Sequence, residues 1–308
     1  MNKTAAFLLK WTAIFLAASI LIFGLVRLMP VSPVNQWLST FDLPHTEENI
    51  AYVTKKMGLD KPLIIQYFDW ILNFLKGDWG YSLKSHLDIR EQFAQKLPYS
   101  IAIGLTGILV SSVVSFFLGY RAALHNRGIC DRITAAIAIL TQSVPSFIIS
   151  IVIIYFFGVK LKLVKFFTGH GAYALITAIL ITAFYSTGPL ARVVKKSFRE
   201  EMTKSYVRFS VSRGFSREHV LLRHASRSVL CRLIATVIAN FATVFGGSTV
   251  LEFAFSIPGI SFFLVSSMQN ADYNVLQTYI LVVIIWMFFV HLILNLVLQL
   301  LDVRRRPE

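Results

Sequence analysis

Few residues in this sequence have the types and spacing that enzymatic chemistry requires. No Gly precedes a Lys anywhere in the 308 residues, so the chain lacks the G-x-x-x-x-G-K-[ST] loop that cradles phosphates. It also lacks the H-E-x-x-H pair of zinc-binding histidines. The seven His are scattered singly, and His45, His86 and His170 could bind a metal only by converging in space. We therefore predict no catalytic residue, no metal site and no cofactor in this chain.

Polar side chains inside long apolar segments are the next candidates. Glu252 is the one acid among them. A charge in the middle of a bilayer costs roughly 2.5–3.5 kcal/mol on insertion scales, so such a residue faces a partner helix or water. Two interpretations of Glu252 stay open. Its carboxylate could reach the lipid headgroups from the end of its segment, or it could line the mouth of a pore.

The most patterned polar stretch is the basic loop at residues 191–232, which is too polar to enter a bilayer. Ser205–Ser212 is long enough for two helical turns, and Gly214 permits a left-handed break. Ser216 can cap a second helix that runs through Val220–Leu222. Two short helices that meet at a glycine would form a compact knob, and we expect a protein partner to dock on it. Binding of lipid headgroups is the alternative.

The elements that must position these residues are membrane spans. Hydrophobic residues make up 56% of the chain and charged residues 15%, and the mean hydropathy is +0.64. A bilayer core about 30 Å thick needs about 20 helical residues. The sequence predicts an all-α polytopic membrane protein with six spans, at Phe7–Met29, Tyr99–Tyr120, Ile133–Phe157, Ala172–Leu190, Leu233–Phe255 and Val275–Leu301.

Charge distribution orients these spans. With both termini in the cytoplasm, 19 of the 30 Lys and Arg lie inside, 11 of them in the loop at residues 191–232. Loops rich in Lys and Arg stay in the cytoplasm, so we predict that both termini are inside. The net charge of +14 then reflects topology and membrane lipid rather than nucleic acid. Cys130 and Cys231 fall in or beside cytoplasmic segments, where a disulfide is not expected.

The expected organisation has three parts. Residues 1–30 form the N-terminal tail and first span, and residues 31–97 form an extracytoplasmic segment with mixed charges and many aromatic residues. Residues 98–308 form a five-helix membrane core that carries the cytoplasmic loop.

Several short motifs in the chain resemble those of a known family. In the loop these are Tyr206-Val207-Arg208, Arg213-Gly214-Phe215-Ser216 and Val220-Leu221-Leu222-Arg223-His224-Ala225. They resemble the coupling loop, or EAA loop, of ABC importer permeases in the dipeptide, oligopeptide and nickel branch. Further resemblances run along the chain in the family's order, at Met57–Leu63, Gln66-Tyr67, Gly77–Ser82, Leu97-Pro98, Val144–Phe147, Glu252, Phe255–Ile260 and Asp272-Tyr273.

The resemblance implies a type I ABC importer permease fold in the bacterial cytoplasmic membrane, as the first of two permease subunits. Its implied partners are a second homologous permease, two ABC ATPases that bind ATP and Mg, and an extracytoplasmic substrate-binding protein. Contact with an ATPase is expected at Tyr206, Arg208, Gly214, Phe215 and Ser216. Glu252, Pro258 and Gly259 are expected near the outer gate. The implied cargo is a peptide, nickel or a metal chelate.

The chain departs from the family's pattern at two positions of the loop and at one site near the C-terminus. Ser228 and Arg232 stand where relatives usually carry an Asn and a Pro, and Asp302-Val303-Arg304 replaces a common Asp-Pro-Arg. These departures favour a specialised cargo such as a metal chelate. An ATP-independent channel or secondary transporter is the alternative function.

Overall fold

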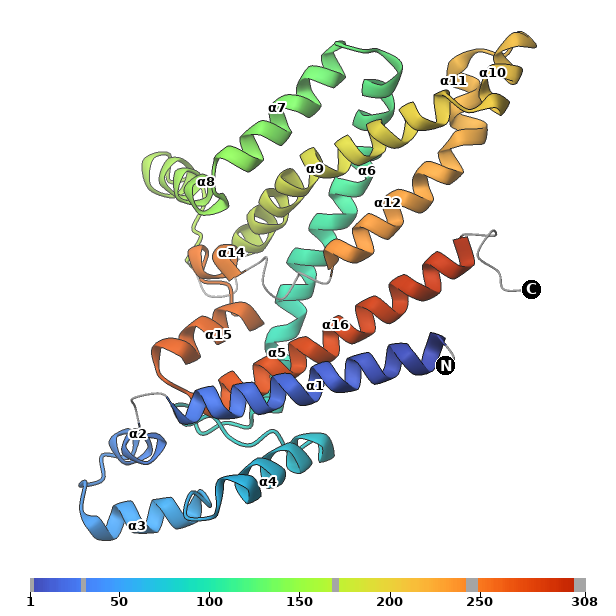
Figure 1. Cartoon of the computed structure of the whole chain (residues 1–308). Coiled ribbons are helices and arrows are strands. Elements are labelled where there is room, and N and C mark those ends of the chain that lie inside the picture. Colours follow the sequence, from blue (N-terminus) through green and yellow to red (C-terminus); the bar gives the residue numbers. More distant parts are fainter. Residues whose placement is uncertain (1–2, 29–31, 168–171, 242–248, 302–308) are drawn as a thin grey trace. The chain divides into compact units, whose positions relative to one another are not determined.

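A computed structural model describes residues 3–28, 32–167, 172–241 and 249–301 (Figure 1). These residues form helices, and within them the only strand-like feature is an isolated antiparallel bridge between Tyr81 and Asp88. The α-helices are α1 (Lys3–Arg27), α2 (Pro33–Thr40), α3 (Glu47–Lys56), α4 (Leu63–Lys76), α5 (Ile89–Ile101), α6 (Gly107–Leu124), α7 (Ile129–Ser143), α8 (Ser146–Ile153), α9 (Ala172–Met202), α10 (Ser205–Ser212), α11 (Arg217–Val220), α12 (Ser226–Phe241), α14 (Thr249–Ala254), α15 (Ile260–Gln269) and α16 (Tyr273–Leu301). Stretches of π-helix connect some of them, at Ala102–Thr106, Ile154–Lys160 and Leu221–Ala225.

Helices long and apolar enough to cross a membrane recur along the chain. In the described residues four qualify, at Phe7–Arg27, Ile89–Leu124, Ala172–Met202 and Tyr273–Leu300, and a bent pair of helices makes a possible fifth. The predicted all-α polytopic fold is therefore confirmed. The count of six spans and the cytoplasmic placement of both termini stay predictions.

The third predicted span is not one straight helix. We expected Ile133–Phe157 to be continuous, but the chain bends by 96° between α7 and α8. The bend falls at Val144 and Pro145, both of which have extended backbone angles. Proline has no N–H to donate to the preceding turn, and its ring disfavours a helical conformation of the residue before it. A single straight helix is therefore the wrong description of this segment, and the bent pair is either one broken span or a re-entrant loop.

Parts of three predictions lie outside the described residues. These are the end of the first span at Met29, the middle of the fifth span at residues 242–248, and the basic tail at residues 304–306. His170 lies there too.

The chain divides into two compact units. The larger, residues 99–261 with 289–308, is built around α6 and α9. Its apolar core joins four elements through Tyr120 of α6, Phe198 of α9, Leu221 of the third π-helix and Val229 of α12. All four side chains are buried, so α9 and α12 are fixed to each other at the end where α10 and α11 lie (Figure 1).

Small residues allow the helices of this unit to approach closely. A Cβ atom at Gly119 of α6 would lie 2.7 Å from the carbonyl oxygen of Ala191 in α9. A Cβ atom at Gly188 of α9 would lie 2.7 Å from the Cα atom of Ala138 in α7. Because the membrane supplies no hydrophobic drive between apolar helices, such close backbone packing is a main source of their association.

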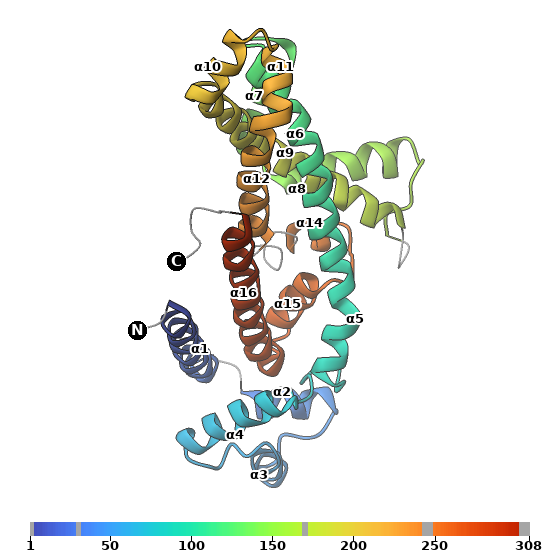
Figure 2. The same cartoon turned by 90° about the vertical axis from the view of Figure 1, so that its right-hand side faces the viewer.

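The smaller unit, residues 1–98 with 262–288, contains the predicted extracytoplasmic segment. Its helices α2, α3 and α4 lie next to one another (Figure 2). Val34 and Leu38 of α2 pack on Val53 of α3, while Ile71 and Phe74 of α4 pack on Leu281 of α16. The segment at residues 31–97 is thus folded, and we call it the cap.

Candidate functional site

The basic loop forms the predicted pair of short helices. Helix α10 covers Ser205–Ser212, and Gly214 follows it with a φ of 89°. The Ser216 side chain accepts a hydrogen bond from the backbone N–H of His219 at 3.2 Å, and α11 begins at Arg217. These three predictions are confirmed, because each rests on a local signal: helix propensity, the tolerance of glycine for positive φ, and an N-cap. We call residues 203–225 the knob.

The knob is a rigid continuation of the helices that carry it. After α11 the chain continues as the π-helix Leu221–Ala225 directly into α12. Leu221 and Ala225 are fully buried against α9 residues that include Leu190 and Val194. A displacement of the knob must therefore move α9 and α12 with it.

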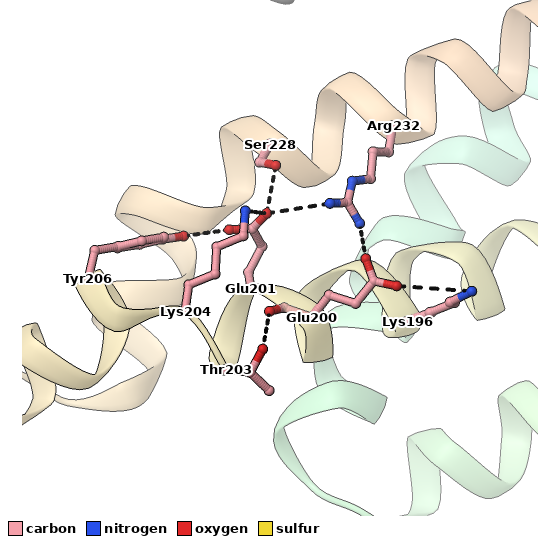
Figure 3. A network of polar contacts seen from close by, with 8 residues as sticks. All are labelled: Lys196, Glu200, Glu201, Thr203, Lys204, Tyr206, Ser228 and Arg232. Carbon is pink, nitrogen blue, oxygen red and sulfur yellow. Dashed lines mark hydrogen bonds and ion pairs between the residues drawn. The ribbon is translucent and has the colours of Figure 1, made fainter. Parts of the chain in front are cut away.

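A buried carboxylate joins the three helices at the base of the knob. Glu201 of α9 is 1% exposed and accepts three hydrogen bonds (Figure 3). The donors are Lys204 Nζ at 2.6 Å, Tyr206 Oη at 2.7 Å and Ser228 Oγ at 2.8 Å. A buried carboxylate is stable only with such partners, and charge-assisted hydrogen bonds are stronger than neutral ones. Glu201 thereby holds the start of α10 against α12.

Arg232 of α12 adds an outer layer to this network. One guanidinium nitrogen contacts the carboxylate of Glu200, and the other lies 3.8 Å from Glu201 Oε1. Lys196 lies 4.0 Å from the other oxygen of Glu200. Arg232 and Glu200 are about half exposed, so solvent screens their pair and limits its contribution to less than about 1 kcal/mol.

The hydroxyl of Tyr206 is a fixed donor in the network. Burial and the hydrogen bond to the Glu201 carboxylate both raise the pKa of Tyr206 above its usual value. The hydroxyl therefore stays protonated at physiological pH. Although the ring is 38% exposed, its polar end points into the base of the knob.

The outer surface of the knob is aromatic and basic. Phe215 is 49% exposed and stacks on His219, with ring centroids 5.9 Å apart. Phe209 is 62% exposed, and the guanidinium of Arg213 lies 5.7 Å from its ring centroid. Between α10 and α11 a hollow of about 400 Å³ has Val207 and Leu221 among its apolar lining and Arg208 and Arg217 among its polar lining. Exposed aromatic and Arg side chains are the residues that most often anchor protein interfaces.

The second candidate site is the buried carboxylate of Glu252. This residue is 0% exposed, and Ser100 Oγ donates a hydrogen bond to its Oε1 at 2.7 Å. Ser100 Oγ in turn accepts from the backbone N–H of Ile260 at 2.9 Å. Gly259 lies against the carboxylate so closely that a Cβ atom there would be 2.3 Å from Glu252 Oε2. The interpretation of Glu252 as a headgroup-facing carboxylate is therefore wrong, because the side chain is enclosed by protein.

Two comparisons decide what kind of protein this arrangement belongs to. Residues 115–307 match the family of binding-protein-dependent transport system inner membrane components. The chain is 31% identical over 288 residues to a dipeptide transport system permease of Bacillus subtilis, with 91% of each chain covered. This chain belongs to that permease family. It is 26% identical to a probable peptide ABC transporter permease of Sinorhizobium fredii, with 97% of each chain covered, and 25% identical to a glutathione transport system permease of Salmonella choleraesuis, with 96% and 95% covered.

The family assignment confirms the resemblance to peptide-branch ABC permeases, and with it a multi-pass protein of the bacterial cytoplasmic membrane. Of the five residues predicted to contact an ATPase, Arg208, Gly214, Phe215 and Ser216 are exposed on the permease's knob. Tyr206 has a second role that we did not predict, because its hydroxyl is part of the network at the base. Glu252 and Gly259 are in contact, and Pro258 precedes Gly259 in the same turn.

Sequence reasoning missed Glu200 and Glu201. From the sequence we assigned neither of them a role within the loop at residues 191–232. A signal was present, since two adjacent acids in the most basic segment of a permease must find cationic partners if either is buried. Arg232 is one of these cationic partners, and Ser228 supplies a neutral hydroxyl donor; in the sequence both stood out only as departures from the family's pattern.

The described residues contain no group of three or more His, Cys, Asp or Glu that could hold a metal ion. On the predicted outer side, Nε2 of His45 lies 3.2 Å from the Ser39 hydroxyl, and the ring of His86 contacts Phe41 with ring centroids 4.2 Å apart.

Proposed function

We propose that the chain is a pore-forming subunit of an ATP-driven importer and that the loop at residues 191–232 couples it to separate ATPase subunits. The supporting observation is the buried Glu201 carboxylate, which ties the knob to both α9 and α12. A docking element can transmit work only if it is rigidly attached to the helices it moves. A chain without a phosphate-binding loop of its own needs that work from another subunit.

The mechanism follows from this attachment. The exposed surface at Arg208, Phe209 and Phe215 sits in a groove of an ATPase subunit. When ATP closes the ATPase pair, the knob moves as a lever, and its displacement passes to α9 and α12 through Glu201 and the buried cluster around Leu221. Packed helices shift as rigid bodies between discrete arrangements, which suits alternation between inward-facing and outward-facing states.

The complete transporter in this proposal contains four kinds of component. A second, homologous permease completes the pore as a heterodimer, two ABC ATPases bind ATP and Mg, and an extracytoplasmic protein delivers the cargo. The present chain contributes no catalytic group. The contact of Glu252 with Ser100 and Gly259 is proposed as part of the outer gate, since the buried side chain and the turn at Gly259 pack so closely that a shift of one must move the other.

A peptide is the cargo that we propose. The relatives are named for dipeptide, peptide and glutathione transport. The sequence argument for nickel or a metal chelate rested on the departures at Ser228 and Arg232. Their hydrogen bond to Glu201 and ion pair with Glu200 explain these residues without reference to cargo, which weakens that argument. Nickel and metal chelates remain the second candidates.

Purification from the native membrane, followed by uptake in proteoliposomes, tests the proposal. We expect the chain to co-purify with a second permease and with ATPase subunits, and we expect labelled dipeptide uptake to require ATP and the binding protein. A chain that purifies alone and transports without ATP would instead be a channel or secondary transporter. Uptake of a labelled metal chelate but not of dipeptide would transfer the cargo assignment to the second candidate.

A further inference from the structure

The smaller unit contains a pocket that the coupling proposal does not use, lined by residues of the cap, α1 and α16. Its volume is about 480 Å³. Ligand pockets in proteins typically measure about 300–1,000 Å³ and combine aromatic walls with a few convergent polar groups. Here the walls include Phe23, Trp70, Trp79 and Tyr273. Four of the separate outer motifs, around Gly58, Gln66, Trp79 and Tyr273, meet at this pocket.

One cation of the pocket is held in place, yet it has no carboxylate partner among the residues that the structure describes. Arg27 Nη2 donates a hydrogen bond to Gln66 Oε1 at 2.8 Å, and its guanidinium lies 4.5 Å from the Phe23 ring centroid. Gln66 is 8% exposed and is itself fixed, because its Nε2 donates to the carbonyl oxygens of Leu59 and Lys61. In the described part of the chain no carboxylate lies within ion-pair distance of Arg27. A guanidinium has five donors and matches a carboxylate in a two-pronged geometry.

A second wall of the same pocket holds a buried amide with unused hydrogen-bonding capacity. Gln277 of α16 is 4% exposed, and its Nε2 has no hydrogen-bond partner among the described residues. Leaving a buried donor unsatisfied costs about 1–3 kcal/mol, so native proteins rarely keep one without a reason. Because Gln277 also lines the pocket, rotation of its amide toward the cavity would let a ligand oxygen accept from this donor and remove that cost.

The charges of the pocket favour an anion. Four cations line it, at Arg27, Lys55, Lys56 and Lys61, against two acids, Asp69 and Asp78. Lys61 is already paired with Asp69 at 2.7 Å, and Asp78 accepts from the backbone N–H of Gly80. The net charge of the side chains that line the pocket is therefore positive, and the oriented guanidinium of Arg27 contributes to it.

We propose that this pocket binds a small organic carboxylate, with Arg27 and Gln277 holding the carboxylate group and Trp70 and Trp79 contacting its apolar part. The site goes beyond the coupling role, since binding here needs neither ATP nor an ATPase. A free small molecule is the occupant that we propose because the pocket has the volume of a ligand site. A lipid headgroup phosphate is an alternative anion at the end of a membrane helix, and the experiment must separate the two.

Titration calorimetry on the full chain in nanodiscs of neutral phosphatidylcholine is the test. The probes are the dipeptide alanyl-leucine, its C-terminal amide, and glycerol phosphate as a headgroup mimic. We expect saturable binding of the dipeptide, and at least tenfold weaker binding of the amide and of glycerol phosphate. Equal binding of dipeptide and amide, absence of binding, or stronger binding of glycerol phosphate would each overturn the proposal.

Variants identify the residues responsible. Arg27→Gln should weaken dipeptide binding about tenfold to hundredfold, as expected for loss of charged hydrogen bonds, and Arg27→Lys should weaken it less. Gln277→Leu should also weaken binding yet leave thermal stability unchanged or higher, because its Nε2 has no partner to lose. The matched control is Lys76→Gln, which removes an exposed cation from α4 outside the pocket. Unchanged binding in both Arg27→Gln and Gln277→Leu would refute the site, whatever the outcome for ATP-driven uptake.

Discussion

At the scale of single residues, Glu201 and Glu252 are the two buried glutamates that the candidate sites depend on. Glu201 has three donors at 2.6–2.8 Å, and Glu252 has at least the hydroxyl of Ser100. Both carboxylates are 0–1% exposed, a condition in which an ionised group depends wholly on its partners. Changes to these glutamates or to their neighbours should therefore have larger effects than changes to exposed charges.

Replacement of Glu201 by Gln tests the link between the knob and the transport helices. The amide cannot accept the three hydrogen bonds with the strength of a carboxylate, and we expect a loss of about 1–3 kcal/mol in the local stability of the knob. Uptake in proteoliposomes should fall at least tenfold, while ATP hydrolysis continues. The matched control is Glu218→Gln, an exposed acid of the same loop, which should leave both rates unchanged. Equal, small effects of the two substitutions would show that Glu201 does not transmit the coupling.

Replacement of Gly259 by Ala tests the packing around Glu252. The new Cβ atom would lie 2.3 Å from the carboxylate oxygen, so either the glutamate or the turn at Pro258 must shift. Such overpacking costs typically about 1–3 kcal/mol, and we expect a lower Tm in thermal unfolding of the purified protein. Gly24→Ala is the control, since nothing lies within 4 Å of its Cβ position. An unchanged Tm in Gly259→Ala would mean that the carboxylate is free to move aside.

At the scale of elements, the knob depends on one backbone conformation. Gly214 has a φ of 89°, and its N–H donates to the carbonyl of Val211 at 2.9 Å. Proline requires a φ near −65° and has no N–H, whereas Asn tolerates the left-handed region better than other non-glycine residues. A substitution at position 214 is therefore limited by the backbone conformation that the new residue can adopt, and not by the volume of its side chain.

We expect Gly214→Pro to separate ATP hydrolysis from uptake. The variant should insert into the membrane normally, because the change lies outside the spans, yet uptake should fall to near background as α10 and α11 lose their relative orientation. Gly214→Asn should keep most of the uptake. Measurement of both rates in proteoliposomes distinguishes the outcomes, and wild-type uptake in Gly214→Pro would remove the docking role of the knob.

At the scale of the whole molecule, orientation in the membrane is the prediction with the widest consequences. The knob must face the cytoplasm for an ATPase to reach it, and the cap must face outward. In a background with Cys130→Ser and Cys231→Ser, we expect Glu48→Cys in α3 to react with a membrane-impermeant maleimide in spheroplasts. Arg213→Cys in the knob should react only after the membrane is opened. Labelling of Arg213→Cys before that step would reverse the topology and exclude the coupling function.

Much of the protein could be predicted from the sequence because the deciding signals are local. Apolar runs of sufficient length indicated the spans, the excess of Lys and Arg indicated an orientation, and Gly214 and Ser216 indicated how the knob is built. The bend at Pro145 was missed although its signal is also local, since a proline within a span can be tolerated or can break it according to the tertiary context.

What only the tertiary structure decided are the contacts between residues far apart in the chain. Ser228 donates to Glu201 across 27 positions, and Ser100 donates to Glu252 across 152. No periodicity or motif encodes such pairs, because a buried carboxylate can be satisfied by any donor that the fold brings near it. The local sequence determined the helices, the knob and the family, whereas packing decided which glutamate ties the knob to its helices and which polar side chains meet at the pocket of the smaller unit.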